Sequence, residues 1–408
     1  MNEAPVPSAL TSRSVCLLAL LLAFPSFGFV QKYAGLAGLA AYLAAVVAAV
    51  ALIATFGHRF APWIGRHFRL LTIFAVAGML AGFVVLHPFE DDRGPGKSSD
   101  RNEGLELAVA RIAEGKNPYY PPRVFPGPLS VFPGSIILSS PFAALGNSGY
   151  QNIFWLTAFL LAASKWFKDK ALALVLLAVP LAISPAAMYE FVSGGDLISN
   201  GIFVALLAML ALRAFADPAT PAWHRWGACV LLGVCLASRA NFILLTPLIG
   251  ATIWRIAGLR QTIAATAVVC LSSLAVSLPF YLIDPSAFTP LMSRRKLALV
   301  NDSLPWAGTA MIGMTVLMAA CGAVMLLLRR KDEPIPAFFR WCTFVTLTPI
   351  VCAILFSSFV HGAPDFGFLR DRFGLMYIPF ALLGWGGSWL RKAGTATPME
   401  IPEQSPLT

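Results

Sequence analysis

Residues 70–122 read LLTIFAVAGMLAGFVVL followed by HPFEDDRGPGKSSDRNEGLELAVARIAEGKNPYYPP. The first part is apolar, whereas the second, His87–Pro122, is the one long polar stretch and carries seven of the twenty acidic residues of the chain. Apolar runs of about twenty residues, the length that crosses a ~30 Å hydrocarbon core, recur on both sides of it. This contrast predicts a membrane protein whose chemistry is concentrated in one polar loop.

The composition agrees with that fold class. The 408 residues are 58% hydrophobic and only 12% charged, with a mean hydropathy of +0.73. Because backbone groups in lipid must be hydrogen-bonded internally, we expect an all-α polytopic protein. The net charge of +10 does not indicate a nucleic-acid partner, since Lys and Arg in cytoplasmic loops of a membrane protein explain it.

About twelve transmembrane helices are predicted from the apolar runs. We place them at residues 14–30, 34–56, 70–86, 150–167, 171–188, 199–216, 226–238, 241–257, 262–283, 306–328, 338–360 and 373–390. A further apolar piece, Leu129–Leu145, is interrupted by Pro133 and Pro141, which favours an interfacial or re-entrant segment.

Loop charges predict the orientation. Basic residues gather in alternate loops: Arg59, Arg66, Arg69, Lys168, Lys170, Arg213, Arg225, Arg255, Arg260, Arg329, Arg330, Lys331, Arg340, Arg391 and Lys392. By the positive-inside rule both termini are cytoplasmic and the acidic loop is extracytoplasmic, in what we expect to be a bacterial inner (plasma) membrane. Residues 1–393 form one transmembrane domain, which includes the outer loop 87–128, and residues 394–408 read as a disordered cytoplasmic tail.

The acidic loop contains one amphipathic helix. Leu105, Ala108, Val109 and Ile112 recur at helical spacing, and acidic residues occupy the opposite face. We expect this helix to lie on the membrane surface with its apolar stripe toward the lipid, and to end at Gly115.

The order of motifs resembles the GT-C superfamily of membrane glycosyltransferases, in particular its polyprenyl-phosphomannose-dependent branch. That branch has an Asp before a helix that ends in Gly-x-x-Pro-Tyr. The matching residues are Asp100, Gly115, Asn117, Pro118 and Tyr119, then Ser238-Arg239-Ala240-Asn241-Phe242 with Pro247, Pro279-Phe280 with Asp284-Pro285, and Arg372-Phe373 with Pro379. The resemblance covers about residues 70–390, and it departs from the family at Arg101, where an aromatic residue is usual.

The resemblance implies a hexosyltransferase, for example a mannosyltransferase, that uses a polyprenyl-phosphate sugar donor and inverts the anomeric carbon. Its partners are that donor, membrane lipids and an extracytoplasmic glycan, glycolipid or protein acceptor. Asp100 then acts as the general base, although the Asp91/Asp92 pair competes for this role. Capping of the helix that follows is an alternative explanation for Asp100.

A divalent ion is a second way to stabilise the leaving phosphate. Mg²⁺ or Mn²⁺ fits carboxylates such as Asp91, Asp92 and Asp100, although no spacing in the sequence requires it. The seven cysteines lie in apolar runs and form no CxxC pattern, so we interpret them as small core residues.

Cations on the outer side are candidates for binding the donor phosphate. Arg294, Arg295 and Lys296 lie in an outer loop, where anionic lipid headgroups are an alternative partner. Arg239 lies between two spans, and ionisable residues near membrane depth are usually paired and functional. Arg372 is a further candidate, although a local salt bridge to Asp371 is its simplest role. We expect Asp100 and either Arg239 or Arg294 to border one outward-opening cavity.

Five residues are candidates for binding the sugar or the acceptor: Glu103, Asn117, Tyr119, Asp196 and His361. Helix capping is the favoured explanation for Asp196, and a lone His is more often structural.

Two other functions remain open. A transporter or flippase of lipid-linked saccharides would place its polar residues at mid-bilayer in broken helices, commonly in repeats, and we find no internal repeat. A non-catalytic scaffold would use the acidic loop only to recruit partners.

Overall fold

The computed structural model describes residues 12–91, 101–119, 129–292, 304–329 and 333–388. Within these ranges the chain is helical and contains no strand. The α-helices are α1 (Ser12–Ala23), α2 (Phe27–Arg66), α3 (Phe68–Asp91), α4 (Arg101–Ala113), α5 (Pro133–Ala143), α6 (Tyr150–Trp166), α7 (Lys170–Ile183), α8 (Pro185–Val192), α9 (Leu197–Ala216), α10 (Ala222–Leu236), α11 (Ala240–Ile243), α12 (Thr246–Ala257), α13 (Leu259–Ile283), α15 (Ala307–Leu328), α16 (Pro334–His361) and α17 (Ile378–Trp385). The 3₁₀ helices are η1 (Phe24–Ser26), η2 (Thr289–Met292), η3 (Gly367–Asp371), η4 (Phe373–Tyr377) and η5 (Gly386–Ser388).

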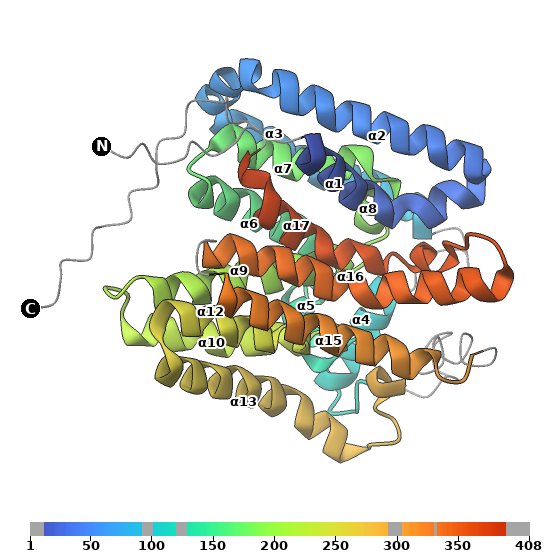
Figure 1. The fold of residues 1–408 in the computed structure, drawn as a ribbon. Coiled ribbons are helices and arrows are strands. Elements are labelled where there is room, and N and C mark those ends of the chain that lie inside the picture. The colour runs from blue at the N-terminus through green and yellow to red at the C-terminus, as the bar shows by residue number, and fades with distance from the viewer. Residues whose placement is uncertain (1–11, 92–100, 120–128, 293–303, 330–332, 389–408) are drawn as a thin grey trace, which may run out of the picture.

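The long helices lie side by side as a bundle (Figure 1). The N-terminal helices α1–α3 cover one side, and α10 and α13 cover the opposite side. Helix α9 is the central element, since 83% of its most apolar window is buried, far more than in any other long helix described. The all-helical fold is confirmed for the described residues, and their long apolar helices indicate an integral membrane protein.

Seven helices in the described part of the chain are long and apolar enough to cross a membrane, or eight if the bent pair α7–α8 is one span. The prediction of about twelve spans is not confirmed. Several predicted spans correspond to helices below the length of a full span, such as α10 with 15 residues. The last predicted span, 373–390, is a 3₁₀ turn followed by the eight residues of α17.

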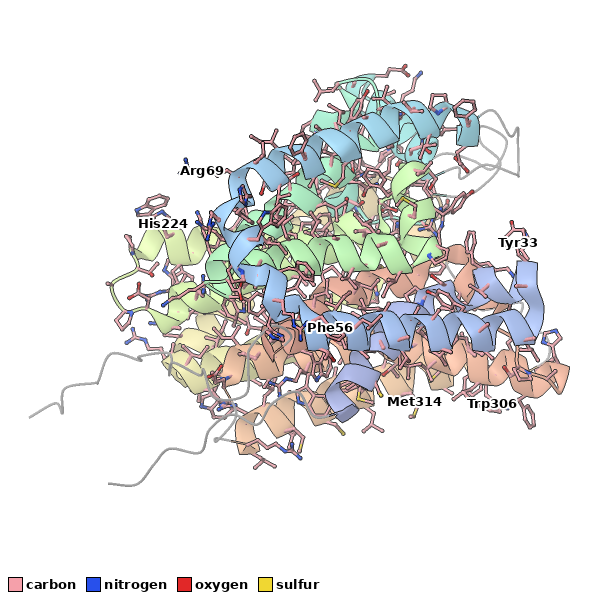
Figure 2. All side chains as sticks on the ribbon, turned by 90° about the horizontal axis from the view of Figure 1, so that it is seen from above. Tyr33, Phe56, Arg69, His224, Trp306 and Met314 are labelled. Carbon is pink, nitrogen blue, oxygen red and sulfur yellow. The ribbon has the colours of Figure 1, made fainter. Side chains whose placement is uncertain are left out.

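The first apolar unit contains two of the predicted spans. Residues Cys16–Arg66 form 51 helical residues, which as a straight helix would extend about 76 Å, far beyond a ~30 Å core. The helix is interrupted at Gly35, whose φ of 65° and ψ of −167° are not helical. Tyr33 lies at the end of the bundle where the chain turns back (Figure 2). This break separates the predicted spans 14–30 and 34–56.

The predicted span 171–188 is not a straight helix, because the chain bends by 92° between α7 and α8. Pro185 begins α8, and its missing N–H and fixed φ prevent α7 from continuing. The Ser184 hydroxyl caps the new helix by accepting a hydrogen bond from the backbone N–H of Ala187 at 3.3 Å.

Helix α4 forms and stops as predicted. Its buried residues Asn102, Gly104, Leu105 and Ala108 pack against the protein, whereas Ile112 is 38% exposed. Neighbouring protein therefore covers Leu105 and Ala108 of the predicted apolar stripe, and the position of the helix at the membrane surface stays a prediction. Gly115 follows the helix with a φ of 71°, the left-handed conformation typical of a helix end.

The segment after α4 is a short helix covered by protein. Helix α5 starts at Pro133 and has 11 residues, or about 17 Å, too short to span the bilayer. The backbone N–H groups of Phe132 and Gly134 donate to the carbonyls of Ser238 and Ala237, at 3.0 and 2.8 Å. These bonds fix the start of α5 against the end of α10.

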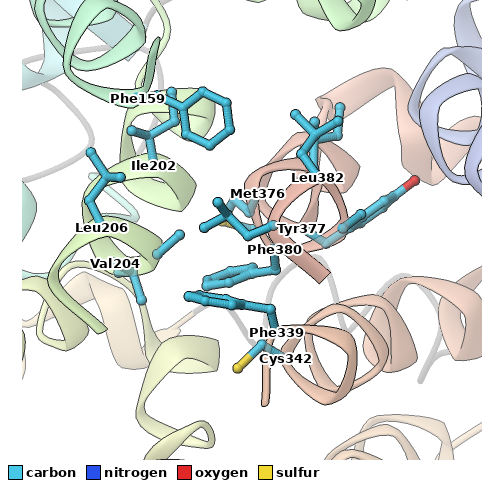
Figure 3. Packing of buried hydrophobic residues seen from close by; sticks show 14 of the residues in the cluster. Phe159, Ile202, Val204, Leu206, Phe339, Cys342, Met376, Tyr377, Phe380 and Leu382 are labelled. Atoms are coloured by element: carbon cyan, nitrogen blue, oxygen red, sulfur yellow. The ribbon is translucent and has the colours of Figure 1, made fainter. Parts of the chain in front are cut away.

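The core joins α9 to α16 and α17. Figure 3 shows Phe339 and Cys342 of α16 facing Phe380 of α17, with Ile202 and Leu206 of α9 across from them. The rings of Phe339 and Phe380 are stacked with centroids 6.5 Å apart. Cys342 is buried here, and all seven cysteines are free.

Candidate functional site

A group of buried or half-buried charged side chains lies where the ends of several helices meet. We call Glu90, Arg101, Glu190, Asp196, Arg239 and Arg372 the charged cluster. They come from α3, α4, α8, the α8–α9 turn, the turn before α11, and the turn between η3 and η4. Glu190 and Asp196 are fully buried, so their charge is compensated by protein groups rather than by water.

Arg239 and Asp196 form the most tightly bonded pair of the cluster. One terminal nitrogen of Arg239 donates to both carboxylate oxygens of Asp196, at 2.7 Å to Oδ1. The amide of Asn200 donates to the same carboxylate at 2.7 Å, and the hydroxyl of Ser135 donates to it at 3.3 Å. Arg239 is therefore paired, as predicted for an ionisable residue near membrane depth.

The capping role predicted for Asp196 is wrong. Asp196 is the residue before α9, but its side chain makes no cap hydrogen bond and instead binds Arg239. The carboxylate of Glu190 takes over this function, because its Oε1 accepts the backbone N–H of Leu197 at 2.8 Å. The free N–H groups of the first turn favour a negative charge at that position.

Glu190 also holds two arginines. Nε of Arg372 lies 3.1 Å from Glu190 Oε2, and a terminal nitrogen of Arg101 lies 3.9 Å from Oε1. Arg372 further donates to the hydroxyl of Ser193 at 2.9 Å. Arg372 is thus paired with an acid far away in the sequence, whereas the side chain of Asp371, its predicted partner, lies outside the described residues.

A glycine allows the α8–α9 turn to close over this carboxylate. A Cβ at Gly195 would lie 2.4 Å from the carboxyl carbon of Glu190, a distance that no side chain tolerates without movement. Its backbone N–H donates to the Glu190 carbonyl at 3.0 Å, and its carbonyl accepts the amide of Asn152 at 2.8 Å. The Gly194-Gly195 pair in the sequence is explained by this close approach.

Aromatic rings complete the cluster. The Tyr189 hydroxyl donates to Glu90 Oε1 at 2.6 Å, and the guanidinium of Arg372 lies 4.6 Å from the centre of the Tyr189 ring. Arg101 lies 5.2 Å from the ring centre of Phe373. Such cation–π contacts orient an arginine without neutralising it.

The electrostatics of the cluster are set by burial and by the arginines together. Burial alone would raise the pKa of Asp196, but the nearby Arg239 and Arg101 guanidinium groups outweigh it and hold that pKa below its usual range. Burial lowers the pKa of Arg372, with Arg101 adding to the effect and Glu190 opposing it. Arg101 therefore acts on both buried pairs, and its side chain is the most exposed of the three arginines, at 17% against 6% and 7%.

Helix α4 is held against this cluster by polar contacts. Oε1 of Glu106 accepts the backbone N–H of Ser148 at 2.8 Å, and the Ser148 hydroxyl donates to the Asn102 carbonyl at 3.2 Å. The side chain of Asn102 packs against Gly194. The start of α4 is thus fixed beside the α8–α9 turn.

Several predicted site residues lie outside the described residues. These are Asp92, Asp100, Arg294, Arg295 and Lys296, together with the side chain of Asp91 at the end of α3. Arg101 follows Asp100 in the sequence, and Glu90 precedes Asp91. Two residues of the charged cluster are therefore sequence neighbours of the two candidate bases. No group of three His, Cys, Asp or Glu side chains that could hold a metal occurs in the described part of the chain, and the predicted Asp ligands lie outside it.

The remaining candidates are placed as follows. Glu103 is half-buried on the first turn of α4. Asn117 accepts the backbone N–H of Tyr119 at 3.0 Å, and Tyr119 is buried, donates to the Val131 carbonyl at 3.2 Å and has its pKa raised by burial. His361 is exposed, 3.5 Å from Asp365. The structure brings Asp196 into the cluster but not Tyr119 or His361.

Sequence reasoning missed Arg101 and Glu190. Arg101 was noted only as a departure from the family pattern, and Glu190 was not among the candidate residues. A signal was present for Glu190, because an acid that follows an apolar segment and precedes another is expected to have a buried partner. Nothing in the sequence identified that partner.

The predicted cavity bordered by Asp100 and by Arg239 or Arg294 stays a prediction, because Asp100 and Arg294 lie outside the described residues. Two cavities in the described part of the chain are lined by residues other than those of the charged cluster. One, of about 30 Å³, is lined by apolar side chains such as Phe159, Ile202 and Leu382. The other, of about 140 Å³, lies between α12, α15 and α16.

Comparison of the chain with protein-family models, with curated proteins and with solved structures gives no match.

Proposed function

We propose that this chain is a membrane glycosyltransferase that moves a hexose, such as mannose, from a polyprenyl-phosphate donor to an acceptor on the extracytoplasmic side. One observation carries the proposal. Arg101, the residue after the candidate base Asp100, meets Arg372 at the buried carboxylate of Glu190. Segments far apart in the sequence thus bring a second arginine to Arg101, and Arg101 directly follows in sequence the acid that the motif order singles out.

The reaction is a single displacement with inversion. The acceptor hydroxyl oxygen attacks the anomeric carbon, and the bond from that carbon to the phosphate oxygen breaks. Polyprenyl phosphate leaves with the electron pair, while Asp100 takes the proton of the attacking hydroxyl. The negative charge that develops on the phosphate is stabilised by cations.

Arg101 is the cation that we assign to the phosphate. Its side chain is 17% exposed, against 6% for Arg239 and 7% for Arg372, which makes it the most accessible of the three arginines. Arg372 and Arg239 then keep Glu190 and Asp196 in place, so that Arg101 is presented at a fixed position.

The finer features of the sequence prediction belong to this proposal. They are about twelve spans with both termini in the cytoplasm, the inner membrane of a bacterium, and the charged cluster on the outer side. The acceptor is a glycan, a glycolipid or a protein, and Mg²⁺ or Mn²⁺ at Asp91, Asp92 and Asp100 is an alternative source of phosphate stabilisation.

The test uses membranes that contain the protein and a labelled polyprenyl-phosphate hexose, with loss of the lipid donor as the readout. Asp100→Asn is expected to lower the turnover rate by roughly 10²–10⁴-fold, because a positioned general base contributes about that much. Asp91→Asn, assayed alongside, decides between the two candidate bases.

Glu114→Gln is the matched control. Glu114 belongs to the same loop, but it is exposed and pairs only with exposed Lys116 at 2.7 Å, so its loss should leave turnover unchanged. If Asp100→Asn and Asp91→Asn both retain full transfer, or if Glu114→Gln loses as much as either, no base operates in this loop and the proposal fails.

A transporter or flippase of lipid-linked saccharides is the second candidate. One observation favours it: the 92° bend between α7 and α8 lies directly before the buried acids Glu190 and Asp196, and broken helices with buried charges are typical of transporters. Reconstituted vesicles separate the two. Movement of an intact lipid-linked sugar between leaflets, with no new glycosidic bond, supports transport and contradicts transfer.

A further inference from the structure

A second group of arginines surrounds the cavity at the opposite ends of the helices from the charged cluster. Arg255 lies in the last turn of α12, Arg329 follows the last residue of α15, and Arg340 lies near the start of α16. All three line one cavity of about 140 Å³. A single water needs only about 10–15 Å³ by the same kind of measure, so this space holds a larger guest.

The lining is amphipathic. Trp341 and Phe344 of α16 and Met325 of α15 form its apolar wall, and none of the described residues that line it is acidic. Three guanidinium groups beside one space offer the charge-assisted hydrogen-bond donors that a phosphate group prefers. The helix dipole explains Arg255 and Arg329 at helix C-termini, but that effect does not require them to converge on a cavity.

One of the arginines is held in position by the protein. Nε of Arg340 donates to the carbonyl of Gly384 in α17 at 3.0 Å. A Cβ at Gly384 would come within 3.0 Å of Arg340, so the two helices touch here through the glycine backbone. The guanidinium of Arg340 is thus oriented before any ligand arrives, which lowers the entropy cost of binding.

We propose that this cavity binds a phosphate group, with the phosphate held by Arg255, Arg329 and Arg340. Two sources share this chemistry: the headgroup of an anionic phospholipid, or a soluble phosphate. The apolar wall favours the lipid, whose chains would lie along Trp341 and Phe344. Basic pockets between membrane helices are known to suit such headgroups.

The experiment is a binding titration of the purified full-length protein in detergent. Short-chain phosphatidylglycerol, short-chain phosphatidylcholine and inorganic phosphate are each titrated, and the dissociation constants are measured by calorimetry. Saturable binding of phosphatidylglycerol with no binding of phosphatidylcholine supports a lipid headgroup. Saturable binding of inorganic phosphate alone assigns the site to a soluble phosphate.

The variant Arg255→Gln/Arg329→Gln should weaken the observed binding by roughly tenfold or more, because each charge-assisted hydrogen bond to phosphate contributes strongly. Arg260→Gln is the matched control, since Arg260 is exposed at the same end of the bundle and does not line the cavity. Equal weakening in both variants, or no saturable binding of either phosphate ligand, overturns the proposal.

Should the double variant fail to fold, as judged by gel filtration and thermal melting, Arg329→Gln is measured alone. Its side chain is exposed, so folding does not depend on it. An unchanged dissociation constant in this variant overturns the proposal as well. Sugar transfer is not the readout here, so the outcome is independent of the glycosyltransferase assignment.

Discussion

The two ends of the helix bundle treat arginine in opposite ways. In the charged cluster, Arg239 and Arg372 are buried and bonded to the buried acids Asp196 and Glu190. At the other end, Arg213 is exposed and lies 4.3 Å from the ring centre of Trp166, and Arg225 donates to the carbonyl of Ala214 at 3.1 Å. A buried ion pair holds its side chains in one position but costs a large desolvation free energy. An exposed arginine costs little desolvation free energy and is held less firmly. Arg239 and Arg372 are thus fixed by buried acids, whereas Arg213 at the opposite end is not.

Removal of Glu190 is expected to have the largest effect. Glu190→Ala deletes the carboxylate that Arg101 and Arg372 share and the cap of α9, so it should lower the free energy of unfolding by about 3–5 kcal/mol. Thermal melting in detergent measures it. Glu114→Gln, an exposed acid with an exposed partner, should shift the melting temperature hardly at all. Similar shifts in the two variants would show that the cluster is no more important to stability than a surface pair.

Gly195→Ala comes next. The added methyl would overlap the Glu190 carboxylate, and such overpacking costs about 1–3 kcal/mol. Gly227→Ala in α10 is the control, because no atom lies within 4 Å of the new methyl and alanine in a helix should stabilise by about 0.5–1 kcal/mol. In a denaturation series, Gly195→Ala should lower the free energy of unfolding and Gly227→Ala should raise it. A change of the same sign in both variants would contradict the close approach of Gly195 to Glu190.

The pH dependence of stability gives a smaller effect. Asp196 has a pKa held below its usual value of about 3.9. Its contribution to stability is therefore complete above that pH and is lost as the pH falls through the lowered pKa. In Arg239→Gln the main lowering cation is gone and burial raises the pKa, so melting temperature should fall less steeply with acid than in the parent. If the melting temperatures of the two proteins fall in parallel as the pH is lowered, Arg239 is not the cause of the lowered pKa of Asp196.

The smallest effect is expected at the opposite end. Arg213→Gln removes one exposed cation–π contact, worth about 0.5–1 kcal/mol, with no buried charge left behind. Its melting temperature should stay close to that of the parent. A loss as large as that of Glu190→Ala would remove the contrast between the two ends.

The fold was predictable from the sequence where hydrophobicity alone determines an element. The apolar run 199–216 predicted α9, which extends from Leu197 to Ala216, because hydrophobicity alone defines a buried span. The bend at Ser184 was also readable, since Ser-Pro is a helix start, but the apolar run on both sides concealed it. Short helices such as α10 cannot be told from full spans by composition.

The charged cluster was predictable only in part. Arg239 was singled out because a charge between two spans needs a partner. Asp196 as that partner was not, since helix rules favoured a cap and the two residues are 43 positions apart. Pairing between residues so far apart in the sequence depends on how the helices pack, and the local sequence does not determine that packing.

The order in which the chain is synthesised determines when the contact between Arg372 and Glu190 can form. Glu190 is synthesised and enters the membrane with α8 long before Arg372 leaves the ribosome, and Ser193 precedes Arg372 by 179 positions. The segment that brings Arg372 also sends the Tyr377 hydroxyl to the carbonyl of Leu21, 356 positions earlier. A segment synthesised after α16 thus binds both α1 and the central acid, so these two contacts form only when most of the described chain has been made.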